Sequence, residues 1–253
     1  MYLSDALFSI KVVVAFLFLI YTCKLDLRER RVPNKVWKYM LLVFIPLDVV
    51  EFLLLKYSFT TFIFAIVQFL LMVGFAYMLY YIGAYGGADA KALMVLAIAF
   101  PIYPKILIFP VLNNGFGVFS FSVLSNSVIS APLLLIYMFF RNLTKEGLKN
   151  IKRDLFYYFV GVKVDAKSIP KFYNLLEYFD GDEFKRVKRG VEPDLKMISR
   201  LKREAEKGTI DRIWATPALP FLIFITIGFL ISVFVGDLLV WILSLFIGKG
   251  LMF

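Results

Sequence analysis

Two aspartates, Asp26 and Asp89, are the strongest candidates for chemistry in this sequence. Each lies beside a long apolar segment, where a charged group is expensive and is therefore a candidate functional residue. Two neighbouring carboxyls cannot both ionise cheaply, so such a pair shares a proton; one member then activates water while the other protonates the carbonyl or the leaving group. Because the chain contains no histidine, this pair indicates aspartyl hydrolysis without an imidazole base.

Each aspartate also has a structural interpretation. Asp26 lies in a charged run, residues 24–31, and could be one member of a solvated cluster. Asp89 could be an N-cap or first-turn acid that the helix dipole favours. These interpretations involve no catalysis, and the residues around each aspartate must decide between them.

A glycine-rich turn precedes Asp89. Gly83, Gly86 and Gly87 remove side chains at positions where the backbone must bend or approach another chain closely. Such a turn would open a path for an extended peptide. A simple hairpin between two membrane helices has the same pattern.

Three further acids lie within apolar segments: Asp48, Glu51 and Asp237. At about 1.5 Å per residue, Asp48 and Glu51 are about 18 and 22 Å into the second apolar segment, away from the end that would carry Asp26 and Asp89. With the helix breakers Pro46 and Gly236 nearby, these three acids support an alternative function, an ion-coupled membrane transporter. A membrane-anchored binding module is a third function class.

The elements that position these residues are expected to be membrane helices. The chain has 253 residues, of which 60% are hydrophobic and 28 are Phe, and its mean hydropathy is +0.78. This composition indicates a protein that lies mostly in hydrocarbon. One cysteine, Cys23, and no histidine exclude a disulfide framework and the usual zinc sites, so we expect no metal and no cofactor. Cys23 is expected to be a small packing residue.

Six segments have about the 20 apolar residues that a bilayer-spanning helix requires. They are residues 6–23, 36–55, 59–82, 92–112, 116–140 and 218–247. The predicted fold is therefore an all-α polytopic membrane protein with six transmembrane helices. A polar insert between the fifth and sixth helices is expected to form a small mixed α/β domain. The predicted divisions are a catalytic membrane domain at 1–140, the soluble insert at 141–212 and the last helix at 213–253.

Within the insert, three segments are expected to have regular structure. Residues 155–164 and 171–179 are predicted to be strands or short helices around a small core, and residues 195–207 have the charge mix of a solvated helix. The insert carries 18 basic and 12 acidic residues. A domain of this charge is suited to contact with lipid headgroups.

The basic residues of the short loops predict the orientation of the chain. The loop at 24–35 carries five of them, whereas the loops at 56–58 and 113–115 carry one and none. The first loop is therefore predicted to be cytoplasmic, with the insert on the same side and both termini outside, in the cell membrane. Asp26 and Asp89 then share the cytoplasmic boundary. The net charge of +10 is explained by the basic residues of the cytoplasmic segments, and we expect no nucleic-acid partner.

On these residues the chain resembles the archaeal preflagellin (archaellin) peptidases, which are related to the type IV prepilin peptidases of the GxGD class of membrane aspartyl proteases. One match is Asp26 followed by a basic run and then Arg31-Val32-Pro33-Asn34. The other is the segment from Gly86 to Lys91, which is similar to the second catalytic motif. The resemblance covers residues 1–140. The chain departs from the family pattern at one position: Ala88 stands where the family has a glycine. Glycine adopts positive φ more readily than alanine does.

The resemblance implies an aspartic endopeptidase that removes a short basic leader from preflagellin or prepilin-like precursors at the cytoplasmic face. The precursor would continue into a hydrophobic helix, and membrane lipids would surround both proteins. Asp26 and Asp89 would be catalytic, with neither metal nor cofactor. The implied motif and substrate-proximal residues are Gly86, Gly87, Ala88, Lys91, Pro33 and Asn34. Lys91 is two residues from Asp89 and thus on another helix face, as expected of a cation that reaches the membrane surface.

Overall fold

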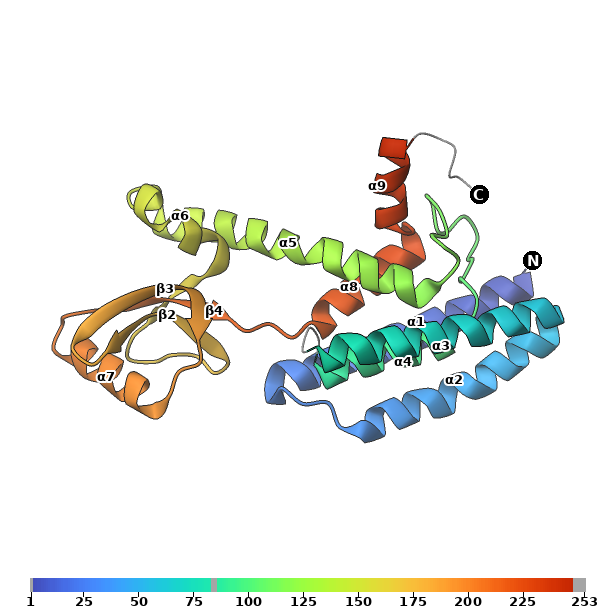
Figure 1. Cartoon of the computed structure of the whole chain (residues 1–253), viewed down its shortest axis with the longest axis horizontal. Coiled ribbons are helices and arrows are strands. Elements are labelled where there is room, and N and C mark those ends of the chain that lie inside the picture. Colours follow the sequence, from blue (N-terminus) through green and yellow to red (C-terminus); the bar gives the residue numbers. More distant parts are fainter. Residues whose placement is uncertain (1, 83–85, 248–253) are drawn as a thin grey trace. The chain divides into compact units, whose positions relative to one another are not determined.

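The computed structural model describes residues 2–82 and 86–247, and the chain divides into two compact units. The first comprises residues 1–131 and 220–253, and the second comprises residues 132–219. The described residues are mostly helical (Figure 1). Gly83, one of the three glycines before Asp89, lies outside the described residues.

Apolar helices build the first unit. They are α1 (Tyr2–Glu29), α2 (Asn34–Leu55), α3 (Phe59–Tyr81), α4 (Gly87–Ala99), α8 (Leu222–Phe234), α9 (Leu238–Ile247) and the first part of α5 (Phe119–Glu146). Among the described residues, three helices, α1, α3 and α5, are long and apolar enough to cross a membrane. These helices confirm the expectation of a helical protein with long apolar segments.

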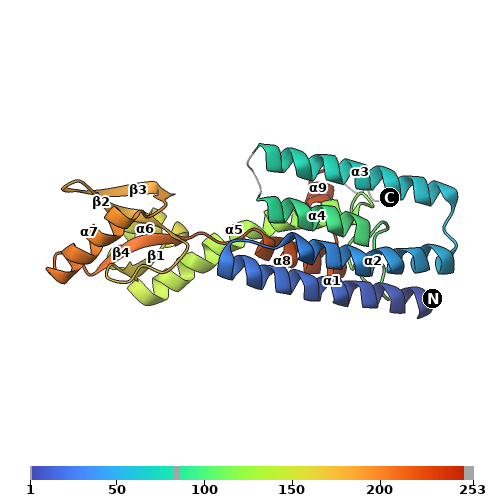
Figure 2. The ribbon, with the colours of Figure 1, turned by 90° about the horizontal axis from the view of Figure 1, so that it is seen from below.

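Helix α4 is the centre of this unit. It packs against α1, α2, α3 and α8, and most of its side chains are buried. Figure 2 shows α4 between α3 and α2, with α1 on the outer side of α2. Aromatic rings from three elements, Phe100, Phe119 and Phe229, meet at centroid distances of 4.7–5.8 Å and fill the core beside α4.

Two apolar segments differ from the uninterrupted helices that the sequence predicts. The segment at 92–112 is helical only to Ala99, because Pro101 follows and Phe100 leaves the helical region with φ −134° and ψ 72°. The segment at 218–247 is divided into α8 and α9. Gly236 has a φ of +116°, which glycine adopts readily and other residues rarely do, and the next helix starts directly after Asp237. By contrast, α2 continues through Pro46.

The second unit contains an antiparallel sheet with strand order β1-β4-β2-β3. Its elements are α6 (Ile151–Val160), β1 (Val162–Asp165), β2 (Tyr173–Asp180), β3 (Glu183–Val191), α7 (Leu195–Glu206) and β4 (Arg212–Pro217). The pairing joins Val162 to Ala215 and Tyr178 to Lys185. The helix expected over residues 195–207 is confirmed as α7.

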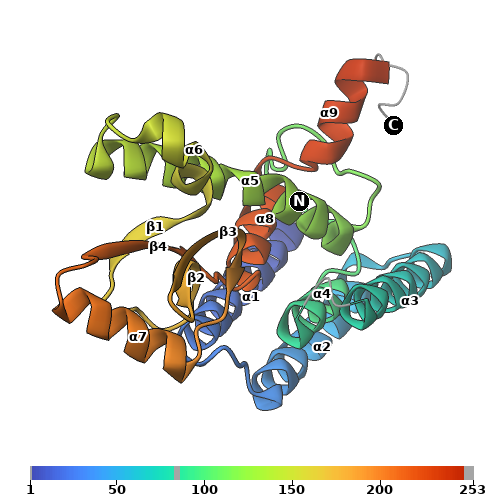
Figure 3. The ribbon, with the colours of Figure 1, turned by 60° about the vertical axis from the view of Figure 1, so that its left-hand side comes forward.

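Alternate residues of the strands face the two helices of this unit. Leu175 and Ala215 belong to one buried cluster with Leu201 of α7. Their sequence neighbours Leu176 and Trp214 pack with α6 instead. Figure 3 shows α6 and α7 on opposite sides of the sheet, as the two-residue period of a strand requires.

Candidate active site

Asp26 lies near the C-terminal end of α1. Its side chain is buried, with 8% of the residue exposed. The helix ends three residues later, where Arg30 adopts a φ of 54° and its backbone N–H donates to the carbonyl oxygen of Asp26 at 3.0 Å. The positive charge of Arg30 acts on the Asp26 carboxylate. Asp26 is therefore a buried acid next to the basic loop, and the structure does not place it in a solvated charge cluster.

Asp89 lies in the first turn of α4 and is 7% exposed. Its Oδ2 atom accepts a hydrogen bond from the backbone N–H of Gly86 at 3.0 Å, which caps the helix. Its Oδ1 atom is buried and has no hydrogen-bond partner among the described residues. The backbone amide of Leu222, at the start of α8, lies near the same carboxylate. One oxygen of Asp89 thus fixes the side chain, while the other is left for a further partner.

The structure brings Asp26 and Asp89 together. Helices α1 and α4 are in contact, and the C-terminal end of α1 and the start of α4 lie at the same end of the first unit (Figure 2). The two carboxylates are close enough to interact electrostatically. Two buried carboxyls in this relationship are the arrangement that proton sharing and water activation require.

Of the two described glycines before Asp89, Gly86 allows a close approach and needs no positive φ. Gly86 has φ −71° and ψ 159°, which any residue can adopt. A Cβ atom on Gly86, however, would lie 3.1 Å from Oδ2 of Asp89. Gly87 starts the helix, and a Cβ atom there would meet only the Tyr80 ring, at 3.5 Å. Ala88 lies within α4, so a positive φ is not needed at the position where the chain departs from its family.

A hydrogen bond joins the two motif segments. Lys91 Nζ in α4 donates to Asn34 Oδ1, the first residue of α2, at 2.7 Å. Pro33 precedes Asn34 in an extended conformation, with φ −60° and ψ 140°, and its carbonyl accepts from Val36 N–H at 3.1 Å. The sequence predicted Lys91 as a cation that reaches the membrane surface, and the family resemblance implied a place near the substrate. Lys91 is exposed, and its bond to Asn34 also fixes the start of α2 to the helix of Asp89.

Sequence reasoning missed the position of Cys23. Cys23 lies one turn before Asp26 in α1, and its thiol is 3.1 Å from the hydroxyl of Thr226 in α8. The charges of both Asp26 and Asp89 act on this thiol. Cys23 packs against the apolar core, as the sequence predicted, and its thiol also lies within electrostatic reach of the two acids. The spacing of three residues from Asp26, which puts both on one helix face, was the available signal.

Asp48 and Glu51 form a separate buried cluster. Both carboxylates accept from the ammonium of Lys11, which is fully buried, with Asp48 at 2.7 Å. Tyr57 also donates to Glu51 at 3.2 Å. The Lys11 ammonium lies 5.4 Å from the centre of the Phe100 ring. This cluster connects α1 to α2 and is distinct from the pair of aspartates.

Asp237 is fully buried in another network. Its Oδ1 atom accepts from the backbone N–H groups of Leu239 and Val240 at 2.9 and 3.2 Å, which caps α9, and its Oδ2 atom accepts from Ser122 at 2.7 Å. Its contacts are with α5 and α9, whereas Asp48 and Glu51 contact α1. The three acids of the transporter alternative therefore do not converge on one site.

Comparison with known proteins gives consistent matches over most of the chain. Residues 13–140 match the type IV leader peptidase family, and residues 153–238 match the family of archaeal peptidase A24 C-terminus, type II. The preflagellin peptidase of Methanococcus voltae is 29% identical over 234 residues, which are 84% of this chain and 89% of that protein. The preflagellin peptidase of Methanocaldococcus jannaschii is 25% identical over 230 residues, which are 87% of this chain and 92% of that protein.

Proposed function

Because the chain belongs to the type IV leader peptidase family, we propose that Asp26 and Asp89 are the catalytic pair with which it removes the leader peptide of a preflagellin-like precursor. The chain is a protease that processes leader peptides, and the aspartic class fits its family. The observation that supports this pair most strongly is that both acids are buried at the same end of two touching helices, within electrostatic reach of each other.

The proposed mechanism uses one proton shared by the two carboxyls. The carboxylate of one aspartate removes a proton from a water molecule, and the oxygen of that water attacks the carbonyl carbon of the scissile peptide. The protonated aspartate donates its proton to the carbonyl oxygen. As the tetrahedral intermediate collapses, the C–N bond breaks, the leaving amine takes the proton held by the aspartate that activated the water, and a hydroxyl of the intermediate returns a proton to the other aspartate. The Gly86 N–H holds Oδ2 of Asp89, so Oδ1 is the oxygen that faces the water in this scheme.

The proposed substrate has a short basic leader followed by a hydrophobic helix. The leader would lie at the cytoplasmic face, and the helix would lie in the bilayer beside the enzyme. The acids Glu177, Asp180, Asp182 and Glu183 offer little attraction for a basic leader, because each is paired with a basic residue of the insert and the insert as a whole is basic. Membrane lipids are the other expected partners, and contact of the insert with lipid headgroups fits its charge.

We propose a six-span topology with both termini outside and the active site and residues 141–212 in the cytoplasm. The fourth crossing would use α4 with the segment that follows it, and the sixth would use α8 and α9. Single cysteines at Ser168 and Asn114, in a chain with Cys23 replaced, test this topology in sealed vesicles. Ser168 should be labelled from the cytoplasmic side and Asn114 from the other side. Labelling of both from one side would contradict the topology.

The decisive experiment for the function is cleavage of a preflagellin-like precursor by the purified chain in detergent. No ion gradient exists under these conditions, so a transporter would show no activity. We expect cleavage between leader and helix, and we expect it to persist in the presence of a chelator because the mechanism uses two carboxyls. Absence of cleavage, or loss on chelation with recovery on adding a divalent metal, would refute the aspartyl proposal.

A further inference from the structure

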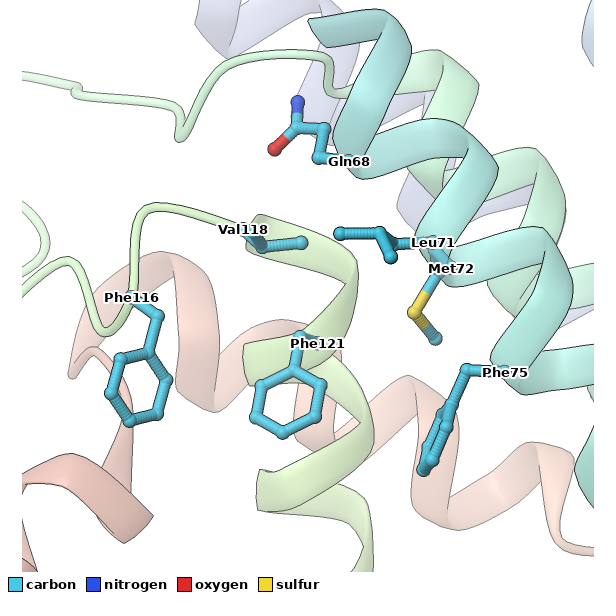
Figure 4. A pocket seen from close by; sticks show the side chains of 7 residues that line it. All are labelled: Gln68, Leu71, Met72, Phe75, Phe116, Val118 and Phe121. Carbon is cyan, nitrogen blue, oxygen red and sulfur yellow. The ribbon is translucent and has the colours of Figure 1, made fainter. Parts of the chain in front are cut away.

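A groove of about 350 Å³ lies between α3 and the start of α5 (Figure 4). One wall is formed by residues of α3: Gln68, Leu71, Met72 and Phe75. The opposite wall is formed by Phe116, Val118 and Phe121. The ring centroids of Phe75 and Phe121 are 6.4 Å apart, and those of Phe121 and Phe116 are 6.2 Å apart. The groove is therefore lined almost entirely by apolar and aromatic side chains.

The α3 wall has the spacing of a helix-recognition surface. Its four residues occupy positions i, i+3, i+4 and i+7, so they form one stripe along the helix. Leu71 is 69% exposed and stands free on this stripe, whereas Met72 is buried at the base. Apolar stripes of this kind, opposed by aromatic side chains, accept an apolar helix laid along them, and a methionine adapts to irregular partners.

Gln68 is the one polar side chain of the groove lining. It is 3% exposed, and its Nε2 atom donates to the backbone carbonyl of Pro101. Its Oε1 atom is buried and has no hydrogen-bond partner within the part of the chain that the structure describes. Figure 4 shows this amide at one end of the groove, with the oxygen on the side of Val118. A buried acceptor without a donor is unfavourable, so a ligand that supplies a hydroxyl or N–H at this depth would be stabilised.

These features select among possible occupants. A lipid acyl chain would fill the apolar walls but has no donor for Gln68. A polar extended peptide has donors but would leave them unpaired along the aromatic wall. A membrane helix with a Ser or Thr among apolar residues satisfies both requirements, since such hydroxyls make interhelical hydrogen bonds. The chemistry of the groove therefore fits an apolar transmembrane helix with one hydroxyl.

The groove also has a fixed relation to the proposed catalytic pair. Helix α3 ends at Tyr81, five residues before Gly86, and packs along α4, so Asp89 is at the Tyr81 end of this helical hairpin. Gln68 is 13 residues before Tyr81 in α3, which corresponds to about 20 Å along the helix. We infer that the groove holds the hydrophobic helix of the precursor, with its hydroxyl about three to four turns beyond the cleavage site. This inference rests on the proposed function and adds a binding site for the part of the substrate that is not cleaved.

A pair of neighbouring leucines provides the test. Leu71 lines the groove, and Leu70, which is 61% exposed on another face of α3, does not. Leu71→Trp would fill the groove, and Leu70→Trp is its matched control. The measurement is kcat/KM of the full chain in lipid vesicles for a precursor with its whole hydrophobic helix, relative to a short peptide that ends soon after the cleavage site. We expect Leu71→Trp to lower this ratio at least about tenfold and Leu70→Trp to leave it at the wild-type value.

A photo-crosslinking amino acid at position 71 or 70 identifies the occupant directly. The precursor helix should be captured from position 71 and not from position 70. Capture of lipid alone at position 71, or an unchanged ratio for Leu71→Trp, would overturn the inference about the groove. Cleavage of both substrates by the wild-type chain would still support the proposed function in that case. If the wild-type chain cleaved neither substrate, the proposed function itself would fail, and the inference with it.

Discussion

The Lys91 ammonium donates to the side-chain oxygen of Asn34 at 2.7 Å, a bond between two side chains 57 residues apart in the sequence. Lys91 follows Asp89 by two residues in α4, and Asn34 is the first residue of α2 after the loop that begins beyond Asp26. The bond therefore connects the helix of Asp89 to the start of α2, which follows the loop after Asp26. The bond explains why Asn34 and Lys91 are polar although their hydrogen bond is to each other and not to Asp26 or Asp89.

A double-mutant cycle should show that Asn34 and Lys91 act together as positioning residues. Asn34→Ala and Lys91→Met should each lower kcat about twofold to tenfold, the effect of one partly solvated hydrogen bond, with little change in KM. The double variant should be no worse than either single variant. Additive losses, or an effect on KM alone, would show instead that the two residues contact the substrate independently. Lys38→Met, an exposed lysine one turn further along α2, is the matched control.

Replacement of either aspartate by asparagine should abolish cleavage. Asp26→Asn and Asp89→Asn keep the side-chain shape but cannot exchange the proton, so each should lower kcat by a factor of about 10² to 10⁴. Circular dichroism and detergent gel filtration should show folded protein. Asp48→Asn and Asp237→Asn should retain much of the activity, because their networks are separate from the pair. Near wild-type cleavage by Asp26→Asn or Asp89→Asn would refute the assignment.

Removal of the Lys11 charge should strongly destabilise the first unit. Lys11→Met would leave the buried carboxylates of Asp48 and Glu51 without their cation, and breaking a buried ion pair in this way costs about 3–5 kcal/mol. Thermal unfolding in detergent should therefore occur at a clearly lower temperature. Adding Asp48→Asn and Glu51→Gln to Lys11→Met should recover most of the loss, because no uncompensated charge remains. Equal thermal stability of Lys11→Met and the wild-type chain would contradict this account.

The local and charge patterns of the sequence predict a large part of this architecture. Apolar segments of sufficient length predict α1, α2, α3 and α5. Asp26 lies at the first loop and Asp89 at the third loop, and because both loops are predicted on one side of the membrane, the two acids are predicted to share that side. The end of α4 was missed because a hydropathy average does not register Pro101, whose effect on Phe100 is steric. The division between α8 and α9 depends in the same way on the backbone of Gly236.

Contacts between distant residues could not be predicted. Lys11 finds its carboxylates 37 and 40 residues away, and β1 pairs with β4 across the intervening strands and α7. No local periodicity specifies such partners. Asn34 and Lys91 were both identified from motifs, yet the bond between them is visible only in three dimensions.

Alkylation of Cys23 by a bulky thiol reagent should inhibit cleavage even though the thiol has no chemical role. The thiol lies one helical turn from Asp26 and is acted on by the charges of Asp26 and Asp89, so an added group would occupy the space proposed for the substrate. We expect at least about tenfold inhibition, slowed by bound substrate, from a steric block of this kind. Cys23→Ala should be active and insensitive to the reagent. Full activity of alkylated wild-type chain, with labelling verified by mass, would show that Cys23 is remote from the site.

The second unit should lose stability in acid through Asp154. This carboxyl is buried in α6, where Arg186 of β3 donates to it at 2.7 Å and Arg153 is 3.1 Å away. Burial raises the pKa of Asp154, but the hydrogen bonds and positive charges of the two arginines outweigh burial and hold the pKa below its usual value. Because the pKa is lower in the folded state than in the unfolded state, the ion pairs stabilise the unit fully above the unfolded value of about 3.9.

As the pH falls through the lowered pKa, that stabilisation should disappear. Hydrogen exchange of β3 and α6 in the full chain, compared with Asp154→Asn at each pH, isolates this contribution. The wild-type protection should exceed that of Asp154→Asn at neutral pH and should approach it at the acidic end. Arg186→Gln should reduce protection at neutral pH at least as much as Asp154→Asn, because Arg186 also holds Glu177 at 2.7 Å and stacks on Tyr157. A difference between wild type and Asp154→Asn that stayed constant down to the most acidic pH would exclude titration of Asp154 as the cause.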